Sequence, residues 1–380
     1  MKRFTFLIIL LVAGFSAAAQ VVQSPRYEQF KEYRNESDTL RMRQMLDNWG
    51  DKDAEFYAAW VNYCSIMADE TQDPTWLEMA VSWAKTGREE YPDEDLLLHK
   101  QSDALFENEQ FQEALPLLLE IDQKGLGDII TWHHLAVIYG AKGDFAQSRK
   151  YLEKMIQNGD EEDQAYAREV AAAYDEIERQ ADSLALRPDH AAIEKLSKKP
   201  EFQKLVNRFE ACDTTLTRDE IAAVYYGSSY LKDYNLVQQQ CEGIRTLAEE
   251  GKNEEAIEAL ETKLKEYPVS LFVLLSLFNL SENEENLHSY AWKAGKILTV
   301  IDHTGSVDDP EQPFQVICVA DEYRALDHLF GMTEFKSQAV VDGPMDKMVF
   351  LNEYGLEMTV YFYLTPPYWE RLNSLFGGND

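Results

Sequence analysis

The chain has 380 residues, of which 68 are acidic and 36 basic, so its formal net charge is −32. This charge repels nucleic-acid phosphates and anionic lipid headgroups, and we therefore expect no nucleic-acid partner and no membrane-surface partner. Four cysteines in a chain of this length are too few for a disulfide scaffold, and the absence of a Cys-x-x-Cys motif argues against a zinc or redox site. Only Cys212 and Cys241 share a segment, and whether they pair stays open.

The first 19 residues have the pattern of a secretory signal. Lys2 and Arg3 form a charged start, and the apolar run that follows, residues 4–15, is too short to cross a bilayer. Ala17-Ala18-Ala19 is a small-residue cleavage site, so we predict cleavage between Ala19 and Gln20. We expect a periplasmic or secreted protein. No later stretch of the sequence is long and apolar enough to predict a transmembrane segment in the mature chain.

Helical patterns continue up to residue 302. Outside the repeats described next, we expect helices at residues 26–49, 54–68, 75–91, 164–184, 190–210, 218–229, 271–280 and 285–301. Arg187-Pro188-Asp189 marks a boundary between two groups of helices. Thr217 and Glu220 form a capping box, which predicts a helix start. Pro116 falls inside a predicted helix, where it removes one backbone hydrogen bond.

Residues 96–159 contain two copies of one unit, offset by 34 residues. The corresponding pairs are Leu98 with Trp132, Leu105 with Tyr139, Phe111 with Phe145, Ala114 with Ser148, and Leu118 with Leu152. A fixed 34-residue period of helical hairpins is typical of tetratricopeptide repeats. The second copy closely resembles that family at Trp132, Leu135, Ala136 and Tyr139, and at its Gly143-Asp144-Phe145 turn. Degenerate copies are expected around Leu77 and Ala80 and from Gly251 to Pro268.

The pattern changes after residue 302. Apolar or alternating stretches predict strands at residues 314–320, 334–341, 347–352 and 356–364. A short helix is expected at residues 321–330 and another after Pro366-Pro367. The first of these helices connects the first two strands, which we therefore expect to be parallel neighbours.

These patterns predict a mainly α protein. A tetratricopeptide-like α-solenoid is followed by further helical hairpins and by a small C-terminal α+β domain with a mixed sheet of about four strands. The expected parts are the signal peptide (1–19), the repeat array (20–186), a helical segment with a degenerate repeat (187–302) and the α+β domain (303–380).

Several segments of the second half carry a further resemblance. They are Asp213-Thr214-Thr215-Leu216-Thr217, Tyr225-Tyr226-Gly227, Phe314-Gln315-Val316-Ile317 with Asp321-Glu322-Tyr323, Ser337 to Gly343, and Tyr361-Phe362 before Pro366-Pro367. From about residue 190 to the end, the chain resembles a family of exported bacterial proteins known as a domain of unknown function. The resemblance implies a secreted protein of helices and a sheet, and it transfers no catalytic residue.

We find no motif that predicts a reaction. His133 and His134 diverge by about 100° on a helix, so both cannot easily bind one metal ion, and a metal shared by His99 and His133 is less favoured than a groove role. The acidic loop at residues 302–309 lacks the alternating ligands and central glycine of a calcium loop. Ser228 lacks the second glycine of a nucleophile elbow, and carboxylate pairs are uninformative in so acidic a chain. We predict no catalytic residue, no cofactor and no metal site.

A cluster of tyrosines leaves two interpretations open. It comprises Tyr225, Tyr226, Tyr230 and Tyr234. The first interpretation is a platform on which a sugar stacks, and the second is packing in the core, where aromatic side chains commonly lie.

The resemblance to tetratricopeptide repeats implies a binding surface, because the first helix of each pair lines the concave side of such arrays. The groove positions are His99, Lys100 and Asp103 in one repeat and His133, His134 and Val137 in the next. The Lys and Asn set of the family's two-carboxylate clamp is absent, so a peptide C-terminus is not the expected ligand. Histidines and lysine make this groove less negative than its surroundings, and protonated histidines would make binding pH-sensitive near neutrality.

The leading hypothesis is an exported, non-enzymatic scaffold that binds a protein or peptide in this groove. The alternative is an enzyme or a glycan-binding module in the C-terminal α+β domain, with the repeats as an accessory. A pocket in that domain lined by carboxylates or aromatic side chains would favour the alternative.

Overall fold

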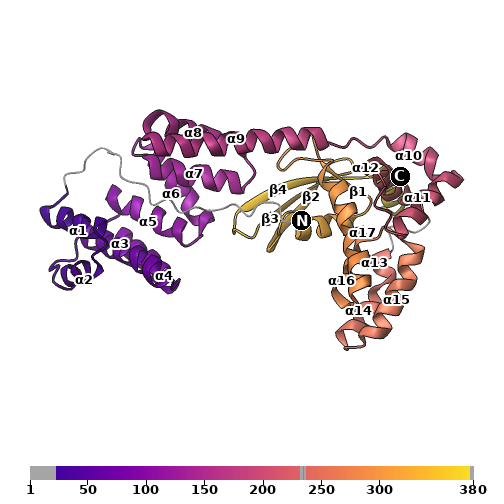
Figure 1. Cartoon of the computed structure of the whole chain (residues 1–380), viewed down its shortest axis with the longest axis horizontal. Coiled ribbons are helices and arrows are strands. Elements are labelled where there is room, and N and C mark those ends of the chain that lie inside the picture. The colour runs from indigo at the N-terminus through magenta and orange to yellow at the C-terminus, as the bar shows by residue number, and fades with distance from the viewer. Residues whose placement is uncertain (1–22, 232–233, 235–236, 377–380) are drawn as a thin grey trace. The chain divides into compact units, whose positions relative to one another are not determined.

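The computed structural model describes residues 23–231, 234 and 237–376 (Figure 1). The predicted signal and its cleavage site lie outside the described residues. The chain divides into two compact units. The N-terminal unit runs to Glu178 and includes Tyr354–Leu356, and the C-terminal unit comprises Arg179–Glu353 and continues from Glu357. Each unit has its own hydrophobic core.

The N-terminal unit is built from helices. They are α1 (Pro25–Asn35), α2 (Thr39–Asp47), α3 (Ala54–Thr71), α4 (Thr75–Glu90), α5 (Asp95–Glu107), α6 (Phe111–Gln123), α7 (Ile129–Ala141), α8 (Phe145–Asn158) and α9 (Glu161–Leu184), whose end belongs to the C-terminal unit. Helices α3 and α4, α5 and α6, and α7 and α8 pack as hairpins. This arrangement is compatible with the predicted repeats.

Local chemistry explains where these helices begin and end. The prediction of one helix over residues 26–49 is wrong, because Ser37 takes a left-handed conformation (φ 53°) and Asp38 caps a new helix by accepting from the Arg41 amide at 3.0 Å. Gly143 (φ 75°) supplies the turn between α7 and α8, and Asp144 caps α8 through the Gln147 amide at 3.0 Å. Helix α6 contains Pro116 without interruption.

Small residues let the helices of each hairpin approach closely. Ala80, Ala84, Ala114 and Ser102 are fully buried. A Cβ atom on Gly87 would lie 2.7 Å from Tyr57 Cβ, which is closer than real carbon contacts allow. Large aromatic side chains fill the remaining space, as in the stacked pair of Trp60 and Trp83, whose ring centroids are 5.0 Å apart. The hairpins therefore depend on alternating small and large side chains.

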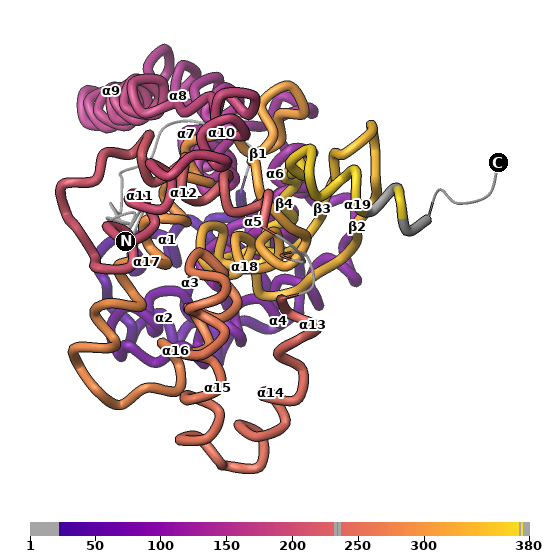
Figure 2. The backbone as a smooth tube through the Cα atoms, turned by 90° about the vertical axis from the view of Figure 1, so that its right-hand side faces the viewer, coloured from indigo at the N-terminus to yellow at the C-terminus, as the bar shows by residue number. Residues whose placement is uncertain are grey.

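The C-terminal unit combines helices with a sheet. Its helices are α10 (His190–Ser197), α11 (Pro200–Glu210), α12 (Arg218–Ser228), α13 (Val237–Gln240), α14 (Glu242–Glu249), α15 (Asn253–Glu266), α16 (Leu271–Leu280), α17 (Glu284–Asp302), α18 (Val319–Leu329) and α19 (Pro366–Phe376). Helices α14 and α15 lie next to each other (Figure 2). The prediction of one helix over residues 190–210 is wrong, because Pro200 starts a new helix. The capping box at Thr217 and Glu220 is confirmed.

The strands form a mixed sheet in the part of the chain that the structure describes. They are β1 (Phe314–Val316), β2 (Glu334–Asp342), β3 (Met345–Leu351) and β4 (Glu357–Leu364), in the order β1-β4-β3-β2. Strand β1 pairs in parallel with β4, placing Phe314 opposite Phe362, so the predicted pairing of β1 with β2 is wrong. The tight connections between β2, β3 and β4 make these three an antiparallel meander, which leaves the edge of β4 for β1. The predicted class, mainly α with a small mixed sheet of four strands, is confirmed.

Residues from both halves of the C-terminal unit share one core. It includes Tyr225 and Leu274 from the helices and Phe350 and Phe362 from the sheet. All four cysteines are free, and Cys212 lies 3.3 Å from Ser289 Oγ rather than against Cys241. No helix among the described residues has the length and apolar character that crossing a membrane requires.

Candidate functional site

The predicted groove residues lie on α5 and α7, the first helices of two neighbouring hairpins. Lys100 donates to Asp103 at 3.2 Å, and the exposed fractions of these two side chains are 18% and 19%. His134 is buried and stacks on Phe106, with ring centroids 3.7 Å apart. His99 and Val137 are half-buried on the same two helices. The polar residues of this face are therefore built into the packing rather than freely solvated.

Polar side chains connect the first helices across the whole N-terminal unit. Asn62 on α3 donates to the Tyr27 hydroxyl on α1 at 3.1 Å. Ser65 on α3 donates to Glu107 on α5 at 2.5 Å.

The connection continues through the next helices. His134 Nδ1 on α7 lies 3.8 Å from Asp103 Oδ1 on α5, and His133 Nε2 lies 3.2 Å from the Tyr166 hydroxyl on α9. We call this set the polar ladder: Tyr27, Asn62, Ser65, Lys100, Asp103, Glu107, His133, His134 and Tyr166.

Burial changes the ionisation of the polar ladder. It lowers the pKa of His133 to about 4, and burial together with the neighbouring His133 lowers the pKa of His134 well below 6.5. The expectation that these histidines titrate near neutrality is therefore wrong. Burial raises the pKa of Glu107 to about 7, so the group that titrates near neutrality is a carboxyl that the sequence did not single out.

A second candidate site lies in the C-terminal unit at the start of α18. The chain leaves β1, and Cys318 in an extended conformation precedes the helix. Asp321 and Glu322 occupy the first turn, where acidic side chains suit the positive end of the helix dipole. Both are nevertheless buried, with exposed fractions of 1% and 0%. Carboxyl groups at such depth are rare unless other groups hydrogen-bond to them.

The Asp321 carboxyl is held by α12. The Tyr225 hydroxyl donates to Asp321 Oδ2 at 2.8 Å and accepts from the Ile317 amide at 3.3 Å. Burial raises the pKa of Asp321 to about 7, although the hydrogen bonds from Tyr225 and Cys318 lower it. Asp321 is therefore close to half-ionised at neutral pH.

Glu322 faces the sheet and forms a carboxyl pair with Asp346 on β3. Burial raises the pKa of Glu322 well above its usual range, and the charges of Asp346 and Asp321 and a hydrogen bond to Asp346 raise it further. Gln338 on β2 donates to both carboxyls, to Glu322 Oε2 at 3.4 Å and to Asp346 Oδ2. Glu322 Oε1 and Asp346 Oδ1 have no hydrogen-bond donor. Glu322 is therefore the protonated member of this carboxyl pair.

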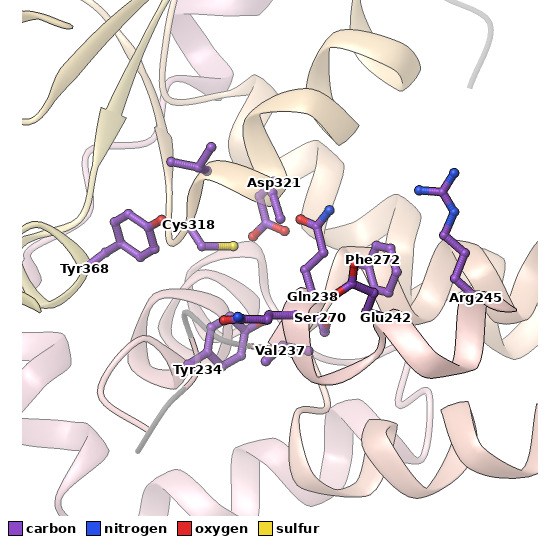
Figure 3. A pocket seen from close by; sticks show the side chains of 13 residues that line it. Tyr234, Val237, Gln238, Glu242, Arg245, Ser270, Phe272, Cys318, Asp321 and Tyr368 are labelled. Carbon is purple, nitrogen blue, oxygen red and sulfur yellow. The ribbon is translucent and has the colours of Figure 1, made fainter. Parts of the chain in front are cut away.

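A cavity of about 420 Å³ opens beside Asp321 (Figure 3). Its walls come from the segment around α13 and α14, from the start of α16, and from the loop and first turn of α18. Cys318, Asp321, Tyr234 and Tyr368 gather towards one end, and Arg245 lies at the other. Burial raises the pKa of the Cys318 thiol well above 9, so this sulfur is a neutral thiol and a poor nucleophile.

Part of the chain that includes this cavity matches a known family model. Residues 189–371 match the family model described as a domain of unknown function (DUF4919). No curated protein matches the chain. The DUF4919 span contains the whole Asp321 environment and leaves the polar ladder outside.

Several of the segments that resemble the family lie together around Asp321 and Glu322. Tyr225 from one contacts Asp321 from another, and the Tyr323 hydroxyl donates to Gln338 Oε1 at 2.7 Å. Tyr225 and Tyr226 are fully buried, so packing in the core is the correct interpretation for these two tyrosines. Among the residues that the structure describes, no three His, Cys, Asp or Glu side chains are arranged to hold a metal ion.

Sequence reasoning missed Asp321, Glu322 and Asp346 because acidic residues are so common in this chain. Their position in the pattern of apolar residues could have identified them. Asp346 falls in register with Met348 and Phe350, whose alternation marks the buried face of β3. A carboxyl on the apolar face of a strand needs a partner, and the second acidic residue of α18 supplies it.

Proposed function

We propose that this protein is an exported, non-enzymatic scaffold whose tetratricopeptide-like helical array binds a protein or peptide along the polar ladder. The observation that carries the proposal is a series of side-chain contacts between neighbouring helices. Hydrogen bonds join α1 to α3, α3 to α5 and α7 to α9, and the stacking of His134 on Phe106 joins α7 to α5. An extended segment lying across these helices would meet the partly exposed members of the ladder, such as Lys100 and Asp103.

Stability alone gives little reason for this arrangement. A partly buried ion pair such as Lys100 with Asp103 loses much of its Coulomb energy to desolvation, and apolar residues of similar size often stabilise a fold better. Ionisable groups along a shared helix face are, in contrast, well suited to select a polar partner, because an unmatched partner would leave them unpaired. This contrast favours recognition over packing as the role of the ladder.

Site-specific photo-crosslinking tests the proposal. A photoreactive amino acid replaces His99 or Val137, and a matched control carries it at Lys150, an exposed position on α8. We expect positions 99 and 137 to crosslink the same partner in the native envelope fraction, and position 150 to crosslink none. The double variant His99→Ala with His133→Ala should weaken capture of that partner. Unchanged capture by a folded double variant would contradict the groove hypothesis.

Export is the second part of the proposal, and it rests on the charged start, apolar run and Ala17-Ala18-Ala19 pattern. The intact mass of the protein recovered from its native source should correspond to a chain that begins at Gln20. A mass that includes residues 1–19 would contradict cleavage.

The C-terminal unit is a second candidate for function. The cavity beside Asp321 has carboxyl groups and aromatic rings in its walls, which is the feature expected of an enzyme or a binding module in this part of the chain. The mixture of buried carboxyls and a neutral thiol supports ligand binding more directly than covalent catalysis.

A further inference from the structure

The cavity beside Asp321 has the size of a small-molecule site. Its volume of about 420 Å³ lies within the range of roughly 300–1,000 Å³ typical of such sites. It lies entirely within the C-terminal unit, and buried polar groups and aromatic rings occur together in its wall. This combination can take a ligand that is polar at one end and apolar at the other.

One wall residue carries a polar group that the fold leaves unused. Tyr234 is 2% exposed, and its hydroxyl has no hydrogen-bond partner among the residues that the structure describes. A buried hydroxyl without a partner destabilises a fold, so such groups are uncommon unless a ligand or water satisfies them. The ring lines the cavity together with Asp321 and Cys318 (Figure 3). The hydroxyl is therefore in place to bond a molecule in the cavity.

The charges around the cavity are mainly negative. Asp321 and Glu242 contribute carboxyl groups. Among the lining residues that the structure describes, the only cation is Arg245, whose side chain is 77% exposed and pairs with Glu249 at 2.9 Å. Arg245 also lies at the end away from Asp321 (Figure 3). Arg324 lies behind the wall, over the outer face of the Phe272 ring at 5.5 Å from its centroid, and is not a lining residue. The carboxyl groups of the wall therefore favour a positive group over phosphates and carboxylates.

We propose that this cavity binds a small alkylammonium group, with its N–H donors directed to the Asp321 carboxylate and the Tyr234 hydroxyl oxygen. The rings of Tyr234 and Tyr368 add the favourable contact that aromatic faces make with ammonium groups. The alkyl part lies towards Val319 and Phe272. The ligand is a free amine or the side chain of a lysine in a peptide, because both present the same group. This inference does not depend on the polar ladder.

A neutral sugar is the main competing ligand, since sugars also bond carboxylates and stack on aromatic rings. The two differ in their dependence on the ionisation of Asp321. An ammonium group needs the carboxylate, whereas a hydroxyl can also bond the neutral acid. Several ionisable groups surround Asp321. They are Tyr225 and Tyr226 on α12, Tyr234 before α13, Cys318 immediately before α18, Glu322 and Arg324 on α18, and Asp346 on β3.

Titration calorimetry of the full chain tests the proposal with defined probes. They are n-butylamine for a free amine, N-acetyl-lysine methylamide for a lysine side chain, and butyrate and glucose as anionic and neutral comparisons. We expect one or both amines to bind at millimolar concentration and the comparisons not to bind. Affinity should rise about tenfold between pH 6 and pH 8, because the ionised fraction of Asp321 rises about tenfold across a pKa near 7.

Two variants locate the ligand. Asp321→Asn should weaken amine binding at pH 8 about tenfold or more and remove its pH dependence. Tyr234→Phe should weaken binding about fivefold without lowering the thermal midpoint, because the lost hydroxyl has no partner in the fold. Glu258→Gln, an exposed change on α15, is the matched control and should leave binding unchanged.

Three outcomes would overturn the inference. They are the absence of amine binding, tighter binding of butyrate or glucose, and amine binding that neither variant weakens. If Asp321→Asn does not fold, the pH profile of the unaltered chain and Tyr234→Phe still decide the matter.

Discussion

The paired carboxyls of Glu322 and Asp346 predict a protein that becomes more stable when one of them is made permanently neutral. The variant is Glu322→Gln. Glu322 is fully buried, and its pKa in the fold is raised well above the value of 4.5 that it has when exposed. A group whose folded pKa is raised stabilises the fold fully below pH 4.5, and this contribution is lost as the pH rises towards the folded pKa.

The size of the effect follows from this linkage. Above pH 4.5 the unfolded chain releases the Glu322 proton while the fold retains it, so the free energy of unfolding falls by about 1.4 kcal/mol per pH unit from this group alone. Glutamine stays neutral in both states and avoids this loss. We therefore expect the gain in stability from Glu322→Gln to be near zero at pH 4 and to grow by about 1.4 kcal/mol for each pH unit above 4.5 over which the fold keeps the proton.

The measurement is urea unfolding of the full chain between pH 4 and pH 8. Hydrogen exchange of peptides from β3 and α18 reports the C-terminal unit separately from helices α3 to α8. Glu258→Gln, an exposed change, is the control and should stay within about 0.5 kcal/mol at every pH. A Glu322→Gln variant that is destabilised equally at pH 4 and pH 7 would refute the explanation that burial keeps the Glu322 carboxyl protonated.

Further predictions concern the polar ladder and the helix packing. Acidification from pH 6.5 to pH 4 should destabilise the N-terminal unit, because the unfolded chain protonates His133 over this range whereas the fold, in which its pKa is lowered to about 4, does not. His133→Phe should reduce the change of the melting temperature with pH, measured by circular dichroism. Glu107→Gln should stabilise the same unit relative to the unaltered chain by up to about 3 kcal/mol at pH 8, because the folded pKa of Glu107 is raised from 4.5 to about 7, and a gain that is no larger at pH 8 than at pH 5 would contradict this. Gly87→Ala should cost about 1–3 kcal/mol, since its new Cβ would lie 2.7 Å from Tyr57 Cβ, whereas Gly295→Ala on α17, with no atom within 4 Å, should stabilise by about 0.5–1 kcal/mol in the same urea titration.

Much of the fold could be predicted because its signals are local. Caps, periodic apolar positions and prolines located α16 at residues 271–280 and the capped start of α12. Two breaks were not predicted. Ser37 separates α1 from α2 by its left-handed conformation, and Pro200 begins α11 after α10. The pairing of β1 could not be predicted from its neighbours, because the meander has two edge strands, β2 and β4, and β1 pairs with β4.

The candidate sites were harder to predict than the fold. The groove positions followed from the repeat period, but their ionisation depends on burial, which reversed the expectation for His133. The Asp321 environment is formed by residues of α12, α18, β2 and β3. In the sequence, its acidic residues cannot be distinguished from the many other acidic residues of the chain. Only their depth distinguishes Asp321 and Glu322 from exposed carboxylates such as Glu258.

The parallel pairing of β1 with β4 sets the time at which the C-terminal unit can form during synthesis. The Tyr225 hydroxyl meets its carboxyl partner 96 residues later in the chain, and Phe314 meets Phe362 only after the last strand has left the ribosome. At about 5–20 residues per second, helix α12 waits several seconds with its buried face uncovered. A chain that ends before residue 362 cannot complete this core, because Phe362 is one of its fully buried residues.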